Sequence, residues 1–103
     1  MKRIFRYPLA MYGKTVVNMP YAEGKHNTLL NASGQVLHIE MKGGQANAWC
    51  VIDDARTSRE VTFYTAMTGE KLDDVCAGSA YCGTFINDDG KYVGHVFVRD
   101  GVL

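Results

Sequence analysis

Four side chains of this sequence have the chemistry to hold a planar, anionic ligand: His38, Trp49, Arg59 and Tyr64. Indole and imidazole rings offer faces for stacking and polar edges for hydrogen bonds, and a guanidinium forms charge-assisted hydrogen bonds with phosphate. We predict that His38 and Trp49 form a stacking platform, and that Arg59 and Tyr64, at the two ends of the next strand, close over the anionic group. Two ordinary alternatives stay open: Trp49 packs beneath a loop, and the arginines are solvated strand ends.

Catalysis and metal binding have weaker support in the sequence. The pair most suited to act as nucleophile and base is Cys82 with His95, which we expect on neighbouring strands. Neither an orienting group nor an oxyanion donor accompanies it, so we predict that the protein is not an enzyme and name no catalytic residue. The other cysteine and histidine spacings do not suit zinc, and the paired aspartates lack the alternation of a calcium loop. We therefore expect no metal and no cofactor.

The composition is that of an ordinary globular protein. The chain has 103 residues, of which 47% are apolar and 21% are charged. This length corresponds to one domain with one modest core, so we assign residues 1–103 to a single domain. The net charge of zero argues against a dedicated nucleic-acid-binding protein, which usually carries a basic excess.

The sequence favours a cytoplasmic location. Its first three residues are those of a signal-peptide start, but Arg6 and Pro8 interrupt the apolar stretch that would have to follow. No run of about 18 apolar residues is present, so we predict no association with a membrane. The three cysteines, an odd number without a secretion signal, indicate reduced thiols. We interpret them as small buried apolar side chains.

Period-two alternation of apolar and polar residues predicts strands through most of the chain, and sustained helical periodicity is absent. The predicted fold class is all-β, an antiparallel sandwich or small barrel of about six or seven strands. At most one short helical turn is expected, within 21–33 or 71–77. The predicted strands cover residues 2–7, 14–19, 35–41, 45–53, 58–66, 81–86 and 91–99.

Two predicted hairpins set the side-chain neighbours in the second half of the chain. A two-residue turn at Gly43-Gly44 places His38 opposite Trp49 on one face and Leu37 opposite Cys50 on the other. On the same apolar face, this turn pairs Ile39 with Ala48 and Met41 with Ala46.

The second hairpin turns at residues 87–90. If Asn87 and Gly90 close it, Gly83 lies opposite Gly94, and the two glycines leave a dent in the sheet. We expect a large core side chain, Trp49 or Phe63, to cover this dent. A bound ligand or the backbone of a partner is the alternative occupant.

Several short motifs, in their order along the chain, resemble a family of short phage and prophage proteins. The resemblance runs from residue 3 to about residue 98 and implies a β-rich fold and a phage origin, but no mechanism. Glu70 departs from it, because the family has a histidine after the Thr-Gly pair, and an insertion occupies Tyr21–Ser33. The motifs are Ile4-Phe5-Arg6-Tyr7, Met19-Pro20, Val36–Glu40, Trp49-x-Val51-Ile52-Asp53, Thr62-Phe63, Thr68-Gly69, Tyr81-Cys82-Gly83-Thr84-Phe85 and Gly94-His95-Val96-Phe97.

The resemblance implies a role in the cytoplasm of a bacterial host, where short phage proteins often counter host defence. Our first hypothesis is that the protein sequesters a nucleotide-derived immune signal in a pocket between protomers. One alternative is direct inhibition of a host effector protein, as by an anti-CRISPR protein, and a further one is a minor structural role in the phage particle. Because a small β domain must protect its strand edges, we also expect a homodimer.

Overall fold

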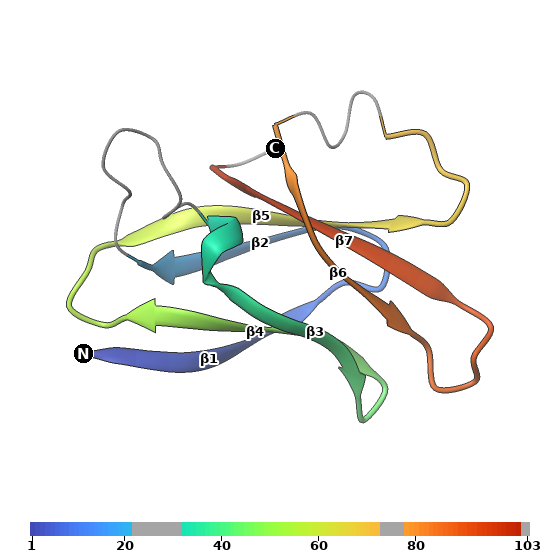
Figure 1. The fold of residues 1–103 in the computed structure, drawn as a ribbon, viewed down its shortest axis with the longest axis horizontal. Helices are drawn as coiled ribbons and strands as arrows, with labels where there is room; N and C mark the ends of the chain where they lie inside the picture. The colour runs from blue at the N-terminus through green and yellow to red at the C-terminus, as the bar shows by residue number, and fades with distance from the viewer. Residues whose placement is uncertain (22–31, 73–77, 102–103) are drawn as a thin grey trace.

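The computed structural model describes residues 1–21, 32–72 and 78–101, which form seven strands and one short 3-10 turn (Figure 1). The predicted all-β fold of antiparallel strands is confirmed, and the strands do not close into a barrel. Most of the two segments in which a helical turn is predicted lies outside the described residues. The elements are β1 (Lys2–Leu9), β2 (Gly13–Pro20), η2 (Ala32–Gln35), β3 (Val36–Lys42), β4 (Gln45–Asp53), β5 (Ser58–Met67), β6 (Ala80–Ile86) and β7 (Val93–Asp100).

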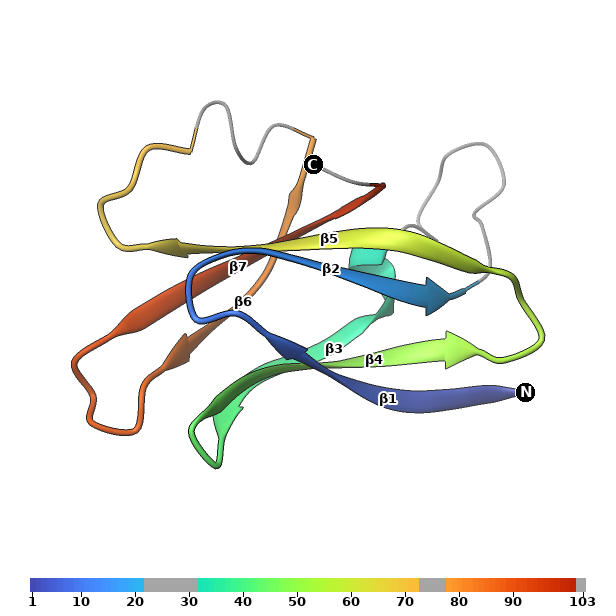
Figure 2. The same cartoon turned by 180° about the vertical axis from the view of Figure 1, so that it is seen from behind.

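The strands form two antiparallel sheets, and both the β1–β2 turn and the β4–β5 turn pass from one sheet to the other. One sheet has the order β1-β4-β3, and the other has the order β2-β5-β7-β6. Figures 1 and 2 show β3 and β6, an edge strand of each sheet, lying side by side and running in the same general direction. The two sheets therefore meet along β3 and β6 without sharing a hydrogen-bonded ladder.

The core lies between the sheets and follows the period-two pattern of the strands. Val61 and Phe63 of β5 are fully buried in it, as is Val96 of β7. Ala48 of β4 faces the same interior from the three-stranded sheet. Because successive side chains of a strand point to opposite faces, the residues between these core positions lie on the outward faces of the two sheets.

The β3–β4 hairpin forms at the predicted turn. Both turn glycines have positive φ angles, 60° at Gly43 and 77° at Gly44, as a two-residue reversal requires. His38 lies opposite Trp49, and the predicted pairs of Ile39 with Ala48 and of Met41 with Ala46 are also present.

The predicted pairing of Leu37 with Cys50 is wrong. A bulge between Val36 and His38 shifts the register, so that Val36 lies opposite Cys50. Leu37 becomes the extra residue of the bulge and is 54% exposed.

The predicted register of the β6–β7 hairpin is wrong by two residues. The strands end at Ile86 and restart at Val93, so the connection has six residues, and the amide of Asn87 donates to the carbonyl of Tyr92. The predicted turn hydrogen bond from the amide of Gly90 to the carbonyl of Asn87 is present, but the residue that closes the hairpin opposite Asn87 is Tyr92 rather than Gly90. The closing pair is therefore two residues further along the chain than predicted, and the hydroxyl of Tyr92 donates to the carbonyl of Met11 in the β1–β2 turn.

The two glycines are consequently not opposite one another. Gly94 pairs with Phe85 and Gly83 with Val96. A Cβ added at Gly94 would lie 2.3 Å from Cζ of Phe85, and one at Gly83 would lie 2.6 Å from Cγ1 of Ile39. Core side chains do cover both positions, but they are Phe85 and Ile39 rather than the predicted Trp49 or Phe63.

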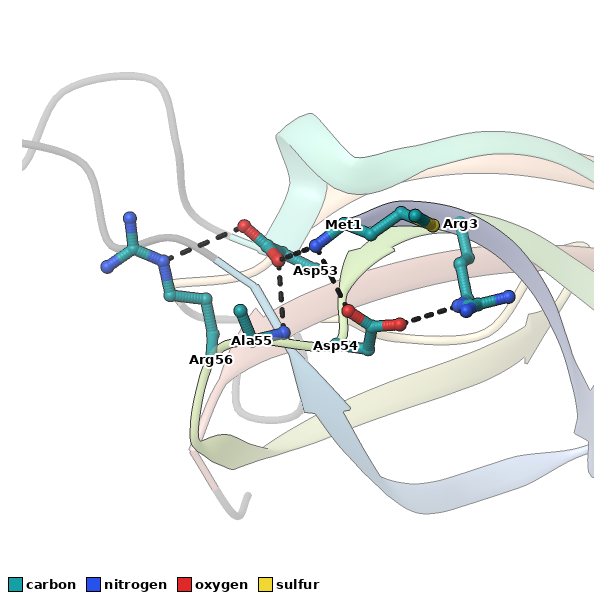
Figure 3. Close-up of polar contacts among 6 residues, drawn as sticks. All are labelled: Met1, Arg3, Asp53, Asp54, Ala55 and Arg56. Atoms are coloured by element: carbon teal, nitrogen blue, oxygen red, sulfur yellow. Dashed lines mark hydrogen bonds and ion pairs between the residues drawn. The ribbon is translucent and has the colours of Figure 1, made fainter.

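Polar contacts at the start of β1 fix this strand against the β4–β5 turn (Figure 3). Nε of Arg3 lies 2.6 Å from Oδ2 of Asp54, and the amino group of Met1 lies 3.2 Å from Asp53 and 3.0 Å from Asp54. The Arg3 hydrogen bond is the main cause that lowers the pKa of Asp54, and the amide of Ala55 has the same effect on the pKa of Asp53.

These lowered pKa values predict a stability that falls in acid. The folded pKa of Asp54 lies below its ordinary value of 3.8, so its contribution is present above that pH and is lost as the pH falls through the folded pKa. We expect Asp54→Asn to lower the urea midpoint at about pH 6 and to have a smaller effect at about pH 3, because the contribution of Asp54 decreases as the pH falls toward its folded pKa. Asp88→Asn, at an exposed turn position, is the control. A wild-type-to-variant difference that is equal at both pH values would contradict this account.

Candidate functional site

The predicted pair of His38 and Trp49 is the centre of the candidate site. The two rings lie on the outward face of the three-stranded sheet, with centroids 5.7 Å apart and planes tilted by 41°. Arg6 of β1 pairs with Trp49 from the other side. Arg6, Trp49 and His38 thus form one row across three strands, which we call the Trp49 platform.

The two flanks of the Trp49 platform differ in charge. Nε2 of His38 lies 3.2 Å from Oε1 of Glu40, and both side chains are 59% exposed. On the opposite flank, Arg6 is exposed and takes part in none of the ion pairs found among the described residues. An anionic group is therefore favoured at the Arg6 end, whereas a carboxylate borders the His38 end.

Apolar side chains extend the platform over the same sheet face. Ile4 is 63% exposed and pairs with the half-buried Val51, and both lie two residues from the Arg6–Trp49 pair on the same face. Exposed aliphatic groups around a tryptophan are typical of protein interaction surfaces as well as of ligand platforms.

The other two predicted site residues do not join the Trp49 platform. Arg59 and Tyr64 belong to β5, in the four-stranded sheet. Arg59 lies across the ring of Tyr21, 5.6 Å from its centroid. An odd separation of five residues along a strand also puts Arg59 and Tyr64 on opposite faces. The structure thus brings together two of the four residues and separates the others.

Tyr64 is instead held by Glu70. Its hydroxyl donates to Oε2 of Glu70 at 2.6 Å, while the amide of Met67 donates to Oε1 at 3.0 Å. This contact raises the pKa of Tyr64 and lowers the pKa of Glu70. Glu70 therefore links the turn that follows β5 to a tyrosine and a main-chain amide of that strand.

His95 has threonine partners in place of the predicted cysteine. Its Nε2 lies 2.7 Å from Oγ1 of Thr68, and its Nδ1 lies 3.2 Å from Oγ1 of Thr84, the residue opposite it. Cys82 sits at a register shift in β6 and donates its thiol to the carbonyl of Val96. The predicted cross-strand pair of Cys82 with His95 is therefore wrong.

The two described cysteines carry free thiols that are shielded from solvent in part or in full. Cys50 is fully buried, which confirms its interpretation as a small apolar side chain, and Cys82 is half-buried against the core. Burial raises the pKa of each thiol to about 12, so both are protonated at neutral pH. Cys76 lies outside the described residues.

With this geometry in place, comparison with known protein families gives one match. A family model described as a domain of unknown function, DUF7352, matches residues 1–102. The chain belongs to the DUF7352 family. No curated protein and no solved structure matches the chain.

Membership of the DUF7352 family does not assign an activity to the chain, so the function of this DUF7352 protein is inferred from its own residues. Sequence reasoning missed Arg6, because its link to Trp49 depends on pairing between strands 43 residues apart. Within residues 1–21, 32–72 and 78–101, no three His, Cys, Asp or Glu side chains cluster so that they could hold a metal ion. The same part of the chain has no helix of the length and apolar character needed to cross a membrane.

Proposed function

We propose that this DUF7352 protein is a non-enzymatic binding protein that takes a nucleotide-derived ligand on the Trp49 platform. The observation that carries the proposal is the row of Arg6, Trp49 and His38 across one sheet face. A base would stack on the indole, which contributes about 1–3 kcal/mol. The phosphate would face Arg6, whose guanidinium can form two parallel hydrogen bonds with it.

The resemblance to short phage proteins supports a specific biological setting for this binding. A phage protein that removes a nucleotide signal from the host cytoplasm would silence the defence that depends on the signal. An open sheet face supplies only one wall for such a ligand. A second protomer facing it would supply the other wall, so the proposed functional unit is a homodimer.

Direct binding to a host defence protein is the second candidate, and one observation favours it. Ile4, which is 63% exposed, and the half-buried Val51 opposite it add apolar side chains beside the Trp49 platform. Tryptophan surrounded by aliphatic side chains is a common centre of protein interfaces.

The experiment is calorimetric titration with a panel of cyclic nucleotides and cyclic ADP-ribose isomers. We expect one ligand class to bind the wild type, and the double variant Arg6→Ala/His38→Ala to weaken that binding about tenfold or more through loss of the phosphate contact. Arg59→Ala is the control, because Arg59 lies outside the platform and should keep the affinity within about twofold.

Two outcomes would contradict this function. Equal weakening by Arg59→Ala would indicate a site that joins both sheets instead of the platform. The absence of heat with every ligand, together with tight co-purification of a host protein complex, would replace the proposal by direct inhibition of an effector.

A further inference from the structure

A groove of about 330 Å³ runs between β3 and β6, where the two sheets meet. This volume is at the small end of the range for ligand pockets, so the groove admits one or two side chains rather than a whole cofactor. At Gly83 the two strands approach so closely that a Cβ added to this glycine would lie 2.6 Å from Cγ1 of Ile39. The apolar lining comes from Ile39 and Met41 of β3 and from Phe85 and Ile86 of β6.

Both walls of the groove are edge strands. Among the described strands, β3 is paired only with β4, and β6 only with β7. Beyond the Ile39–Gly83 contact, each strand therefore presents main-chain N–H and C=O groups that have no ladder partner among the described strands. Neither strand contains proline, whereas Pro8 lies in β1 and Pro20 in β2, the other two edges. Edges of this kind accept an added strand from a peptide.

The charged residues that line the groove favour a basic peptide. Glu40 and Asp88, both exposed, line it, and no lysine or arginine is found among its described lining residues. His38, which belongs to the Trp49 platform and also lines the groove, contacts the Glu40 carboxylate. An occupant with positive charges on either side of an apolar residue would complement this surface.

We propose that the β3–β6 groove binds an extended, basic segment of a protein partner. Its main chain pairs with a free strand edge, one apolar side chain enters between Met41 and Ile86, and flanking lysine or arginine side chains face Glu40 and Asp88. This site shares His38 with the Trp49 platform but differs from the proposed nucleotide site, because it uses strand edges and the carboxylates of Glu40 and Asp88 rather than the Trp49 ring and Arg6.

The test is fluorescence anisotropy with a labelled octapeptide of alternating lysine and isoleucine. We expect saturable binding that weakens as salt is added, since rim charges are screened. A peptide of the same sequence with alternate N-methylated amides keeps the side chains but loses main-chain donors. Its binding should fall about tenfold or more, because more than one backbone hydrogen bond is removed.

Two protein variants locate the site. Glu40→Gln should weaken peptide binding about two- to fivefold, as expected for one exposed charge pair. Glu60→Gln is its matched control, because it makes the same change at an exposed strand position on β5, away from the groove lining. Ile86→Lys, at a side chain 59% exposed and therefore compatible with folding, should abolish binding by placing a cation in the groove.

Three results would overturn the proposal. Equal binding of the N-methylated peptide would show adhesion through side chains alone. An equal effect of Glu60→Gln would show non-specific attraction to acidic residues. Concentration-dependent self-association that Glu40→Gln disperses, without any peptide binding, would assign the groove to a second copy of this chain.

Discussion

Replacement of Gly94 by alanine is expected to destabilise the fold by about 2–3 kcal/mol, the upper part of the range for overpacked cores. The added Cβ would lie 2.3 Å from Cζ of Phe85, with two further ring atoms within 2.9 Å. Phe85 is 2% exposed, and its ring also packs against Tyr92 with centroids 6.1 Å apart. The ring therefore has little room to move away, and its displacement disturbs the core.

Urea denaturation of a double-mutant cycle checks this cause. Phe85→Leu removes the ring atoms nearest to the new methyl group, so Gly94→Ala should cost less than half as much in that background as in the wild type. The φ angle of Gly94 is not positive, so backbone strain does not enter the comparison. Equal costs of Gly94→Ala in both backgrounds would show that the destabilisation does not come from Phe85.

The β3–β4 hairpin shows what local sequence patterns can predict. Two consecutive glycines supplied the positive φ angles, and the period-two pattern then fixed the partners of His38 and Ile39. The bulge that exposes Leu37 had no comparable signal, because its apolar side chain continues the alternation of the strand. A bulge is decided by how the whole sheet bends, which neighbouring residues do not reveal.

The predicted register of the β6–β7 hairpin was wrong for a different physical reason. Its turn residues do form a reversal, since the amide of Gly90 donates to the carbonyl of Asn87, but Asn87 also donates its amide to the carbonyl of Tyr92, which closes the hairpin two residues later than predicted. The turn residues indicate where the chain reverses, but they do not specify which later residue pairs with Asn87. The side chains that cover Gly83 and Gly94 were predicted from this register, so that prediction was wrong as well.

Only the part of the candidate site that lies in the β3–β4 hairpin could be predicted from the sequence. His38 and Trp49 share a local turn, whereas Arg6 reaches Trp49 through the pairing of β1 with β4. Arg59 and Tyr64 were placed with them because β5 follows β4 along the chain. β5 crosses instead to the other sheet, and such a change of sheet follows from packing of the whole core.

The largest loss of stability is expected for Phe63→Ala, at about 3–5 kcal/mol. Phe63 is fully buried in the middle of β5, and it belongs to the core cluster that includes residues of both sheets. Its truncation removes a large apolar surface from the interior and leaves a cavity that backbone hydrogen bonds on either side prevent from collapsing. The cost should therefore exceed that of any outward-facing aromatic residue.

Phe5→Ala is the matched control for Phe63→Ala. Phe5 also lies in a strand but is 46% exposed, so its truncation should cost less than about half as much.

Urea unfolding of both variants, followed by Trp49 fluorescence and by circular dichroism, gives the two free energies and tests whether the sheets unfold together. Trp49 reports on the three-stranded sheet, while Phe63 belongs to the four-stranded one. If Phe63→Ala lowers the midpoint seen by both probes equally, the sheets share one cooperative core. A fluorescence midpoint that stays at the wild-type value would instead mean that the platform sheet is stable without the other, and the shared core would be refuted.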